Sequence, residues 1–249
     1  MSITFGSGLN AKWLNRKRDK AIDLIKEWLE LCDYQVYGSI SGGKDSLVMA
    51  HLIREVHPDC PFLWVNQGHL AEWDDCIELL YYLRDELKWN IIELCPPLGL
   101  MQLYRKLGMT FDGQFNALDK KQCHELLLYP LNEWAEMHSI KGYAWGLRQE
   151  SRGRKEYLRS KGLLYTKKDG IVICSPIGFW TTEDIWHYID WQKLPYASIY
   201  DIEGRMTFRN GCPIDTALSN WGRMAHLRKN YPKIYFEFAE LFREIKNYA

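Results

Sequence analysis

Apolar residues recur at helical spacing along several stretches of the chain and alternate with short β-prone runs. Residues 14–31 place leucine, isoleucine and tryptophan three and four positions apart among charged residues, a pattern typical of an amphipathic helix. Comparable patterns predict helices over 47–56 and 72–87 and short strands over 34–40, 61–65, 90–94 and 142–146. Strands alternating with helices predict an α/β fold, in which helices cover both faces of a parallel sheet.

The rhythm changes in the C-terminal part of the chain. Two short apolar runs, at 163–166 and 171–174, flank a Lys-Lys-Asp-Gly turn and predict a β-hairpin. The capping-box sequence Thr-Thr-Glu-Asp opens a predicted helix over 181–191, and further helices are expected over 215–228 and 232–245.

This change of pattern predicts two parts of unequal size. An α/β domain is expected over residues 1–160, and a smaller, mostly helical subdomain over residues 161–249 is expected to pack on it. The 249 residues, 47% hydrophobic and 26% charged, can bury a large core and exclude a disordered chain. Basic and acidic residues both number 32, which excludes a globally basic nucleic-acid-binding protein and is compatible with a local basic patch.

Cysteine usage and hydropathy indicate the compartment. The seven cysteines stand singly without a Cys-x-x-Cys pair, as expected for reduced thiols. No run of about 18 apolar residues could span a membrane, and no apolar stretch follows the basic N-terminal residues as in a secretory signal. We therefore expect a cytoplasmic protein with no membrane partner.

The most informative stretch is Gly-Ser-Ile-Ser-Gly-Gly-Lys-Asp-Ser at 38–46. A predicted strand ends there in a glycine-rich turn that leads directly into a helix, so free backbone N–H groups and the positive helix end face an anion. The adjacent glycines let the main chain approach phosphate oxygens, and Lys44 adds a positive charge. Ser41 and Ser46 add hydroxyl donors. The stretch therefore predicts a phosphate-binding loop.

This loop differs from that of enzymes that cleave the γ-phosphate. The spacing from Gly38 to Lys44 nearly satisfies G-x4-G-K-[ST], but Asp45 stands where that motif requires a hydroxyl for magnesium. The next predicted strand ends in Asn66, where such enzymes place a carboxylate for the metal. Both departures argue against γ-phosphate hydrolysis. The alternative to a phosphate-binding loop is an ordinary glycine turn that caps the following helix. Such a turn would not require a lysine beside three small residues.

Ser-Gly-Gly-Lys-Asp-Ser at 41–46 matches SGGxDS, the signature of the PP-loop ATP pyrophosphatase superfamily, which the chain resembles. In that superfamily the loop grips the pyrophosphate end of ATP, attack falls on the α-phosphate, and pyrophosphate leaves. The resemblance implies a Rossmann-like (adenine nucleotide alpha hydrolase-like) sheet and ATP and Mg²⁺ as cofactors. It assigns Asp45 to magnesium binding or to organisation of the loop.

A narrower resemblance is to the phosphoadenosine phosphosulfate reductase branch of that superfamily. Residues 66–72 are similar to its DTGHLFPE stretch, with Asn66 replacing the aspartate. Residues 121–131 resemble its cysteine-then-KxxPL segment, and residues 146–154 its GxRxxxSxxR block, here one residue shorter. Residues 175–201 are similar to its P-I-x-x-W-x-x-E-D-V-W-x-Y-I, LPY and LYD motifs.

Together the two resemblances assign roles to individual residues. The implied catalytic residues are Lys44, Asp45, Arg148 and Arg154. The implied ATP-binding residues are Ser39, Ser41, Gly42, Gly43, Lys44, Asp45, Ser46, Asn66, Gly146 and Arg148.

Departures from the reductases bear on the reaction. Family reductases carry a nucleophilic cysteine in an ECGIH-type tail, whereas no cysteine follows Cys212 here. Iron–sulfur members carry two adjacent cysteines and a later Cys-x-x-Cys, so no iron–sulfur cluster is expected. Cys123 and Cys212 fall near motif positions and are candidate persulfide carriers. The remaining cysteines, Cys32, Cys60, Cys76, Cys95 and Cys174, are expected to be buried.

Residues 148–168 form a basic segment. Only Glu150 and Glu156 oppose its basic residues, which are Arg148, Arg152, Arg154, Lys155, Arg159, Lys161, Lys167 and Lys168. Arg148 and Arg154 follow a predicted strand end and are expected to contact ligand phosphate, since guanidinium binds phosphate bidentately. The others form either a solvated helix face or an extension toward DNA or RNA.

We therefore expect an ATP pyrophosphatase that adenylates a substrate oxygen, which sulfur then replaces, as in DNA phosphorothioation. A cysteine desulfurase is the expected sulfur donor, and thiolation of tRNA is the nearest variant. Two alternatives stay open: a sulfonucleotide reductase with a displaced nucleophile such as Cys212, and a non-catalytic subunit that senses ATP.

Overall fold

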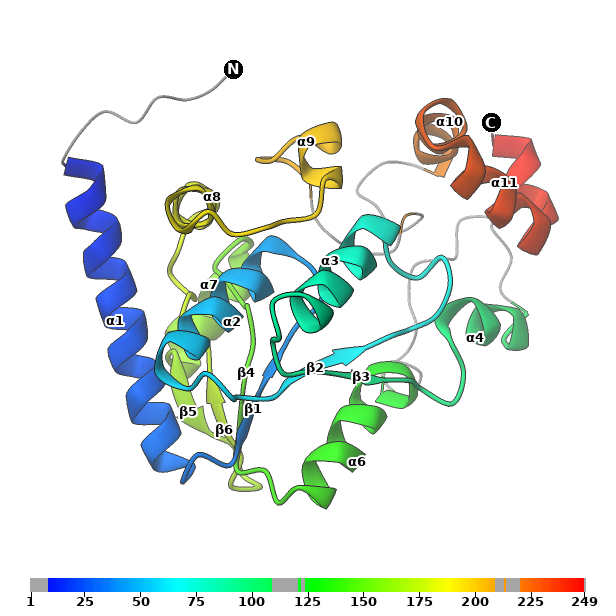
Figure 1. Cartoon of the computed structure of the whole chain (residues 1–249). Coiled ribbons are helices and arrows are strands. Elements are labelled where there is room, and N and C mark those ends of the chain that lie inside the picture. The colour runs from blue at the N-terminus through cyan, green and yellow to red at the C-terminus, as the bar shows by residue number, and fades with distance from the viewer. Residues whose placement is uncertain (1–8, 109–120, 122–123, 209–212, 214–219, 249) are drawn as a thin grey trace. The chain divides into compact units, whose positions relative to one another are not determined.

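The computed structural model describes residues 9–108, 121, 124–208, 213 and 220–248 (Figure 1). The chain divides into two compact units, the first formed by Met1–Trp64, Asp75–Ile92 and Trp134–Phe208, and the second by Val65–Asp74, Glu93–Glu133 and Arg209–Ala249. The described strands are β1 (Val36–Ser39), β2 (Phe62–Val65), β3 (Ile91–Leu94), β4 (Gly142–Ala144), β5 (Leu164–Thr166) and β6 (Val172–Cys174).

The helices of the described residues fall before, between and after these strands. They are α1 (Leu9–Leu31), α2 (Lys44–Val56), α3 (Asp74–Asp85), α4 (Leu100–Lys106), α6 (Tyr129–Met137), α7 (Arg152–Lys161), α8 (Thr182–Gln192), α9 (Ile199–Glu203), α10 (Asn220–Asn230) and α11 (Pro232–Leu241), with the π-helical turn η1 (His124–Leu128) and the 3₁₀ segment η2 (Arg243–Tyr248). In this part of the chain no helix is both long and apolar enough to cross a membrane.

The six described strands form one sheet in the order β3-β2-β1-β4-β6-β5. β1 is parallel to β2 on one side and to β4 on the other, β4 is parallel to β6, and β5 runs antiparallel to β6. The predicted α/β fold is confirmed, and the predicted hairpin extends the same sheet. The order of strands reverses between β1 and β4, and in open α/β sheets ligands bind outside the carboxyl ends of the strands at such a point.

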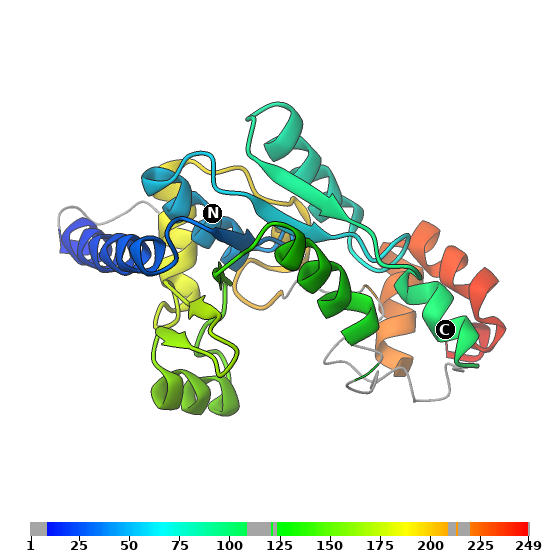
Figure 2. The ribbon, with the colours of Figure 1, turned by 90° about the horizontal axis from the view of Figure 1, so that it is seen from below.

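Helices cover both faces of the sheet. Tyr37 of β1 lies 6.1 Å from Trp134 of α6 between ring centroids, whereas a Cβ on the next residue, Gly38, would lie 3.7 Å from Ile53 of α2. Because successive strand residues point to opposite faces, α2 and α6 lie on opposite sides of the sheet. Figure 2 shows α3 and α6 separated in the same way.

Some elements differ from those that the hydrophobic pattern predicts. α2 begins at Lys44, three residues before the predicted start at 47, because the glycine-rich loop itself provides the first helical turn. A helix at α7 was expected only as one of two interpretations of the basic segment at 148–168. Leu158 is the one buried residue of α7, so the hydrophobic pattern that would predict this helix is weak. The predicted boundary between an α/β domain over residues 1–160 and a subdomain over residues 161–249 stays a prediction.

Candidate functional site

The predicted phosphate-binding loop connects β1, which ends at Ser39, to α2. Gly42 has a φ of +65°, and a Cβ at this position would lie 2.6 Å from the carbonyl oxygen of Cys76 in α3. Backbone conformation and packing therefore both require glycine here. Gly43 precedes α2 and offers no side-chain cap, so N–H groups of the first turn can serve an external anion.

We expect Gly42→Ala to destabilise the protein by about 1–3 kcal/mol, because alanine disfavours the left-handed conformation and its methyl group meets α3. Urea denaturation measures the change. Gly153→Ala in α7 is the matched control, since nothing lies within 4 Å of a Cβ there and alanine favours helix. Equal stability of the two variants would contradict the loop geometry.

The two serines of the loop bond within the loop. The hydroxyl of Ser46 accepts from the backbone N–H of Ser41 at 3.2 Å and donates to the carbonyl oxygen of Gly43 at 3.0 Å. Ser46 is buried and Ser41 is exposed. Ser46 therefore holds the loop closed, and the hydroxyl of Ser41 lies 3.3 Å from that of Ser46.

Tyr200 of α9 closes one side of the loop. Its hydroxyl accepts from the backbone N–H of Lys44 at 3.1 Å, and its ring centroid lies 5.6 Å from the Lys44 ammonium. Burial raises the pKa of Tyr200 well above its usual range, so the hydroxyl keeps a proton that it can donate to an anion. The sequence assigned Tyr200 no role; its place in the LYD-like segment was the available signal.

Lys44 is a buried ammonium beside one carboxylate. Its side chain is 5% exposed, and its Nζ lies 3.6 Å from Oδ2 of Asp45. Burial lowers the pKa of Lys44 and the charge of Arg148 lowers it further, whereas Asp45 opposes both effects. A phosphate group at the loop would stabilise the protonated lysine.

The segment after β4 packs directly on this loop. A Cβ on Gly146 would lie 2.8 Å from the backbone nitrogen of Ser46, so only glycine permits this approach. Two residues later, Arg148 is 2% exposed, and its Nε lies 2.9 Å from Oδ1 of Asp45. Its guanidinium also donates to the carbonyl oxygen of Trp180 at 3.2 Å and pairs with Glu150. The structure thus brings together two predicted basic residues, Lys44 and Arg148.

Arg154 lies one step farther from the loop. Its Nη1 is 2.7 Å from Oε2 of Glu150, whose other oxygen pairs with Arg148. Arg154 is 49% exposed, so its guanidinium reaches solvent. A row of alternating charges therefore runs from Asp45 to the first turn of α7.

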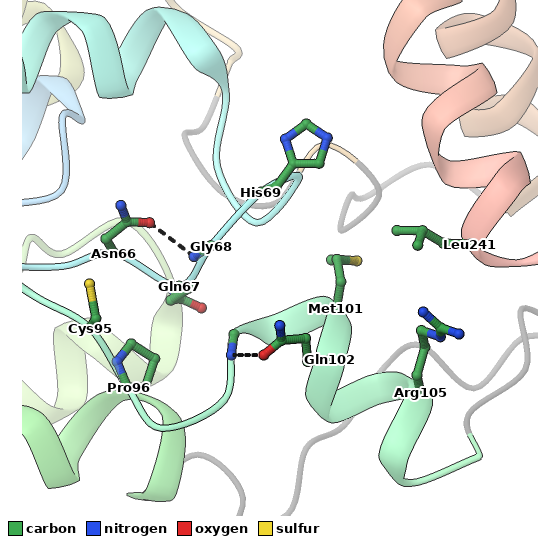
Figure 3. A pocket seen from close by; sticks show the side chains of 11 residues that line it. Asn66, Gln67, Gly68, His69, Cys95, Pro96, Met101, Gln102, Arg105 and Leu241 are labelled. Carbon is green, nitrogen blue, oxygen red and sulfur yellow. Dashed lines mark hydrogen bonds between the residues drawn. The ribbon is translucent and has the colours of Figure 1, made fainter.

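Asn66 belongs to the second unit and has partners there. Its side-chain amide donates to Glu93 at 2.6 Å and its carbonyl oxygen accepts from the backbone N–H of Gly68 at 2.9 Å. Both ends of the side chain are thus engaged in the second unit. Figure 3 shows Asn66 at the wall of a cavity of about 420 Å³, which Cys95 and Arg105 also line.

The cysteine predictions divide into three groups. Cys123 and Cys212, the candidate persulfide carriers, lie outside the described residues. Burial is confirmed for four of the other cysteines, Cys32, Cys60, Cys76 and Cys174. The prediction for Cys95 was wrong: it is exposed, because it follows the end of β3 and lines the cavity instead of the core.

The surroundings of Asp45 bear on the magnesium assignment. Its two carboxylate oxygens lie 2.9 and 3.2 Å from Arg148 nitrogens, and Lys44 is also near. Three or more His, Cys, Asp or Glu side chains that could jointly hold a metal ion occur nowhere in the described part of the chain. A carboxylate already neutralised by two cations does not fit a direct magnesium ligand, so the geometry favours the organising role.

The carboxyl ends of β1 and β4 therefore present two buried cations and a helix N-terminus whose first N–H donates to Tyr200. The model of the protein family described as the phosphoadenosine phosphosulfate reductase domain matches residues 35–234. The chain belongs to this family. The resemblance to the PP-loop superfamily and to its phosphoadenosine phosphosulfate reductase-like branch is thereby confirmed.

Curated relatives of this phosphoadenosine phosphosulfate reductase-domain protein are distant. An uncharacterized protein of Methanocaldococcus jannaschii is 24% identical over 246 residues, which cover 94% of this chain and 54% of the archaeal protein. The phosphoadenosine 5'-phosphosulfate reductase of Synechococcus sp. is 28% identical over 166 residues, covering 66% of this chain and 68% of the reductase. The chain thus spans about half of the first relative and two thirds of the second.

Solved structures share the fold of this family member. The phosphoadenylyl-sulfate reductase of Candida auris has a TM-score of 0.57 at 12% identity, covering 80% of this chain and 94% of the reductase. The U34-tRNA thiolase NcsA of Methanococcus maripaludis, solved with its [4Fe-4S] cluster, has a TM-score of 0.53 at 17% identity and covers 94% of this chain and 79% of the thiolase.

Proposed function

We propose that this chain is an ATP pyrophosphatase that transfers the adenylyl group of ATP to an oxygen of its substrate. The β- and γ-phosphates lie on the loop between β1 and α2, with the adenine against the edge of the sheet. A lone pair of the substrate oxygen forms a bond to the α-phosphorus. The bond from that phosphorus to the bridging oxygen breaks, and pyrophosphate leaves with the electron pair.

The convergence of Lys44 and Arg148 on Asp45 carries this proposal. Both cations are buried and lie at the strand ends where the sheet order reverses. Fixed cations in a site of low dielectric stabilise the charge that develops on departing pyrophosphate. Tyr200 keeps a proton for a phosphate oxygen, and Asp45 holds the two cations in place.

The proposed acceptor is a backbone oxygen of DNA, with tRNA as the variant. Adenylation turns that oxygen into a leaving group. The terminal sulfur of a persulfide, supplied by a partner cysteine desulfurase, then bonds to the acceptor phosphorus, and AMP departs with the oxygen. A thiol next cleaves the sulfur–sulfur bond, which leaves sulfur on the acceptor and a disulfide on the carrier.

Sulfonucleotide reduction is the second candidate. The family match and the similarity to the Synechococcus reductase favour it. It would use the same loop to bind a nucleotide, but a thiolate would bond to the sulfur of the sulfate group, the bond from that sulfur to the phosphate oxygen would break, and adenosine bisphosphate would leave. A second thiol would then form a disulfide with the first and release sulfite.

Two assays with the intact chain separate these candidates. With the nucleic-acid acceptor present, exchange of labelled pyrophosphate into ATP, or release of pyrophosphate, is expected if the chain adenylates. Release of sulfite from phosphoadenosine phosphosulfate with a thiol donor is expected if it reduces. Sulfite release without pyrophosphate chemistry would overturn the proposal in favour of reduction, and exchange without sulfite release would support it.

A further inference from the structure

Helix α7 presents a row of basic side chains to solvent. Arg152, Lys155 and Arg159 are exposed and lie at spacings of three and four residues, so they occupy one side of the helix. Leu158, which is fully buried, anchors the helix to the first unit. Figure 2 shows α7, in lime green, at an edge of that unit.

The basic residues in the first turn of α7 oppose the helix dipole, whereas Arg159 lies in the last turn. The first turn contains no acidic residue and three basic ones, Arg152, Arg154 and Lys155, although the helix dipole favours negative charge at that end. Like charges at these spacings also repel each other. Arg152 pairs with Glu156, whereas within the described residues neither Lys155 nor Arg159 has an ion-pair partner. An external anion bound to these side chains would reduce the repulsion between their positive charges.

The basic row connects to the nucleotide-binding loop. Arg154, in the first turn of α7, pairs with Glu150, which pairs with Arg148, which in turn pairs with Asp45. A polyanion lying along α7 would therefore extend toward the loop. The hairpin that follows α7 adds the exposed residues Lys167 and Lys168.

We propose that the exposed side of α7, formed by Arg152, Lys155 and Arg159, docks the sugar–phosphate backbone of a nucleic acid. This inference rests on the proposed function, since the docked strand would be the acceptor of the adenylyl group. Arg152 and Arg159 lie seven positions apart, which spans about 10 Å of helix, so the row can follow a strand of repeating phosphates. Arginine guanidinium groups bind phosphate bidentately, which suits this partner.

The test compares two variants that lose equal charge in exposed helices of the first unit. Glutamine preserves helix propensity in both. The α7 variant is Arg152→Gln, Lys155→Gln and Arg159→Gln, and the control in α1 is Lys12→Gln, Lys20→Gln and Lys26→Gln. Fluorescence anisotropy measures binding of a labelled DNA duplex of about 20 base pairs, an RNA of the same sequence and polyglutamate at several salt concentrations.

We expect wild type and control to bind nucleic acid with strong salt dependence. The α7 variant should bind at least about tenfold more weakly, with a salt slope shallower by about three. Whichever of DNA or RNA binds more tightly identifies the acceptor. Equal binding by the two variants, or preference of wild type for polyglutamate, would overturn the docking surface.

Pyrophosphate release at a saturating concentration of nucleic acid distinguishes this failure from failure of the proposed function. Its maximal rate should be equal in wild type and the α7 variant, because the three residues lie outside the loop. If pyrophosphate release occurs but α7 does not affect binding, only the docking surface is wrong. If wild type binds nucleic acid through α7 but no exchange or pyrophosphate release occurs, adenylation is wrong and the surface stands.

Discussion

Lys44→Met is expected to abolish ATP–pyrophosphate exchange while leaving the chain at least as stable as the wild type. The ammonium is 5% exposed, and burial is the main cause of its lowered pKa. An apolar side chain of similar length removes that desolvation cost, and Asp45 keeps Arg148 as a partner. The charge that stabilises departing pyrophosphate is lost, so the exchange rate should fall by about 10²–10³-fold.

Exchange kinetics and thermal unfolding of the same preparation measure the two effects. Lys141→Met is the matched control, because Lys141 is an exposed lysine of the first unit that pairs with Asp33. It should keep full exchange activity. Undiminished exchange in Lys44→Met would remove Lys44 from the proposed chemistry, and a large loss of stability would show that its charge is needed for folding.

Stability against pH provides an independent measure of the buried lysine. Between the lowered pKa of Lys44 in the folded chain and its ordinary value of 10.5, the unfolded chain binds more protons. The free energy of unfolding contributed by Lys44 therefore rises with pH through that window. Lys44→Met should lack this rise, which the difference between wild-type and variant urea denaturation at increasing pH would show.

Arg148→Ala is expected to destabilise the chain by about 3–5 kcal/mol and to abolish exchange, because removing one partner of a buried ion pair leaves the other charges uncompensated. Arg148 is 2% exposed and holds two carboxylates, Asp45 and Glu150, as well as the carbonyl oxygen of Trp180. Loss of the guanidinium would leave two partly buried carboxylates facing each other across a cavity.

Two further variants separate the loss of a buried ion pair from the loss of an exposed one and from the loss of charge alone. Arg154→Ala should cost at most about 1 kcal/mol, because that residue is 49% exposed and its ion pair with Glu150 is solvated. Arg148→Lys keeps the charge but cannot reach the same acceptors, so it should recover part of the stability and little activity. Urea denaturation and exchange assays measure both, and equal stability losses for Arg148→Ala and Arg154→Ala would contradict the buried network.

The sequence predicted the elements whose signals are local. The alternation of strands and helices, the hairpin at 163–174 and the glycine-rich turn depend on neighbouring residues, and the structure confirms these elements. Amphipathic α1 was also predictable, because its buried residues Ala21, Ile25 and Trp28 recur at spacings of four and three. α7 gave only a weak signal since it buries just Leu158, and Cys95 was misjudged because burial depends on where a strand ends.

The loop at 38–46 and its suitability for a nucleotide phosphate could be predicted from the sequence alone, because the spacing of glycines and the start of a helix depend on adjacent residues. Only the tertiary structure decided what surrounds that loop. Arg148 reaches Asp45 across 103 positions, and Tyr200 reaches Lys44 across 156. Such contacts follow from the order of strands in the sheet, which no local pattern encodes, and they bring the phosphate-binding turn, its buried cations and the α7 segment into one unit.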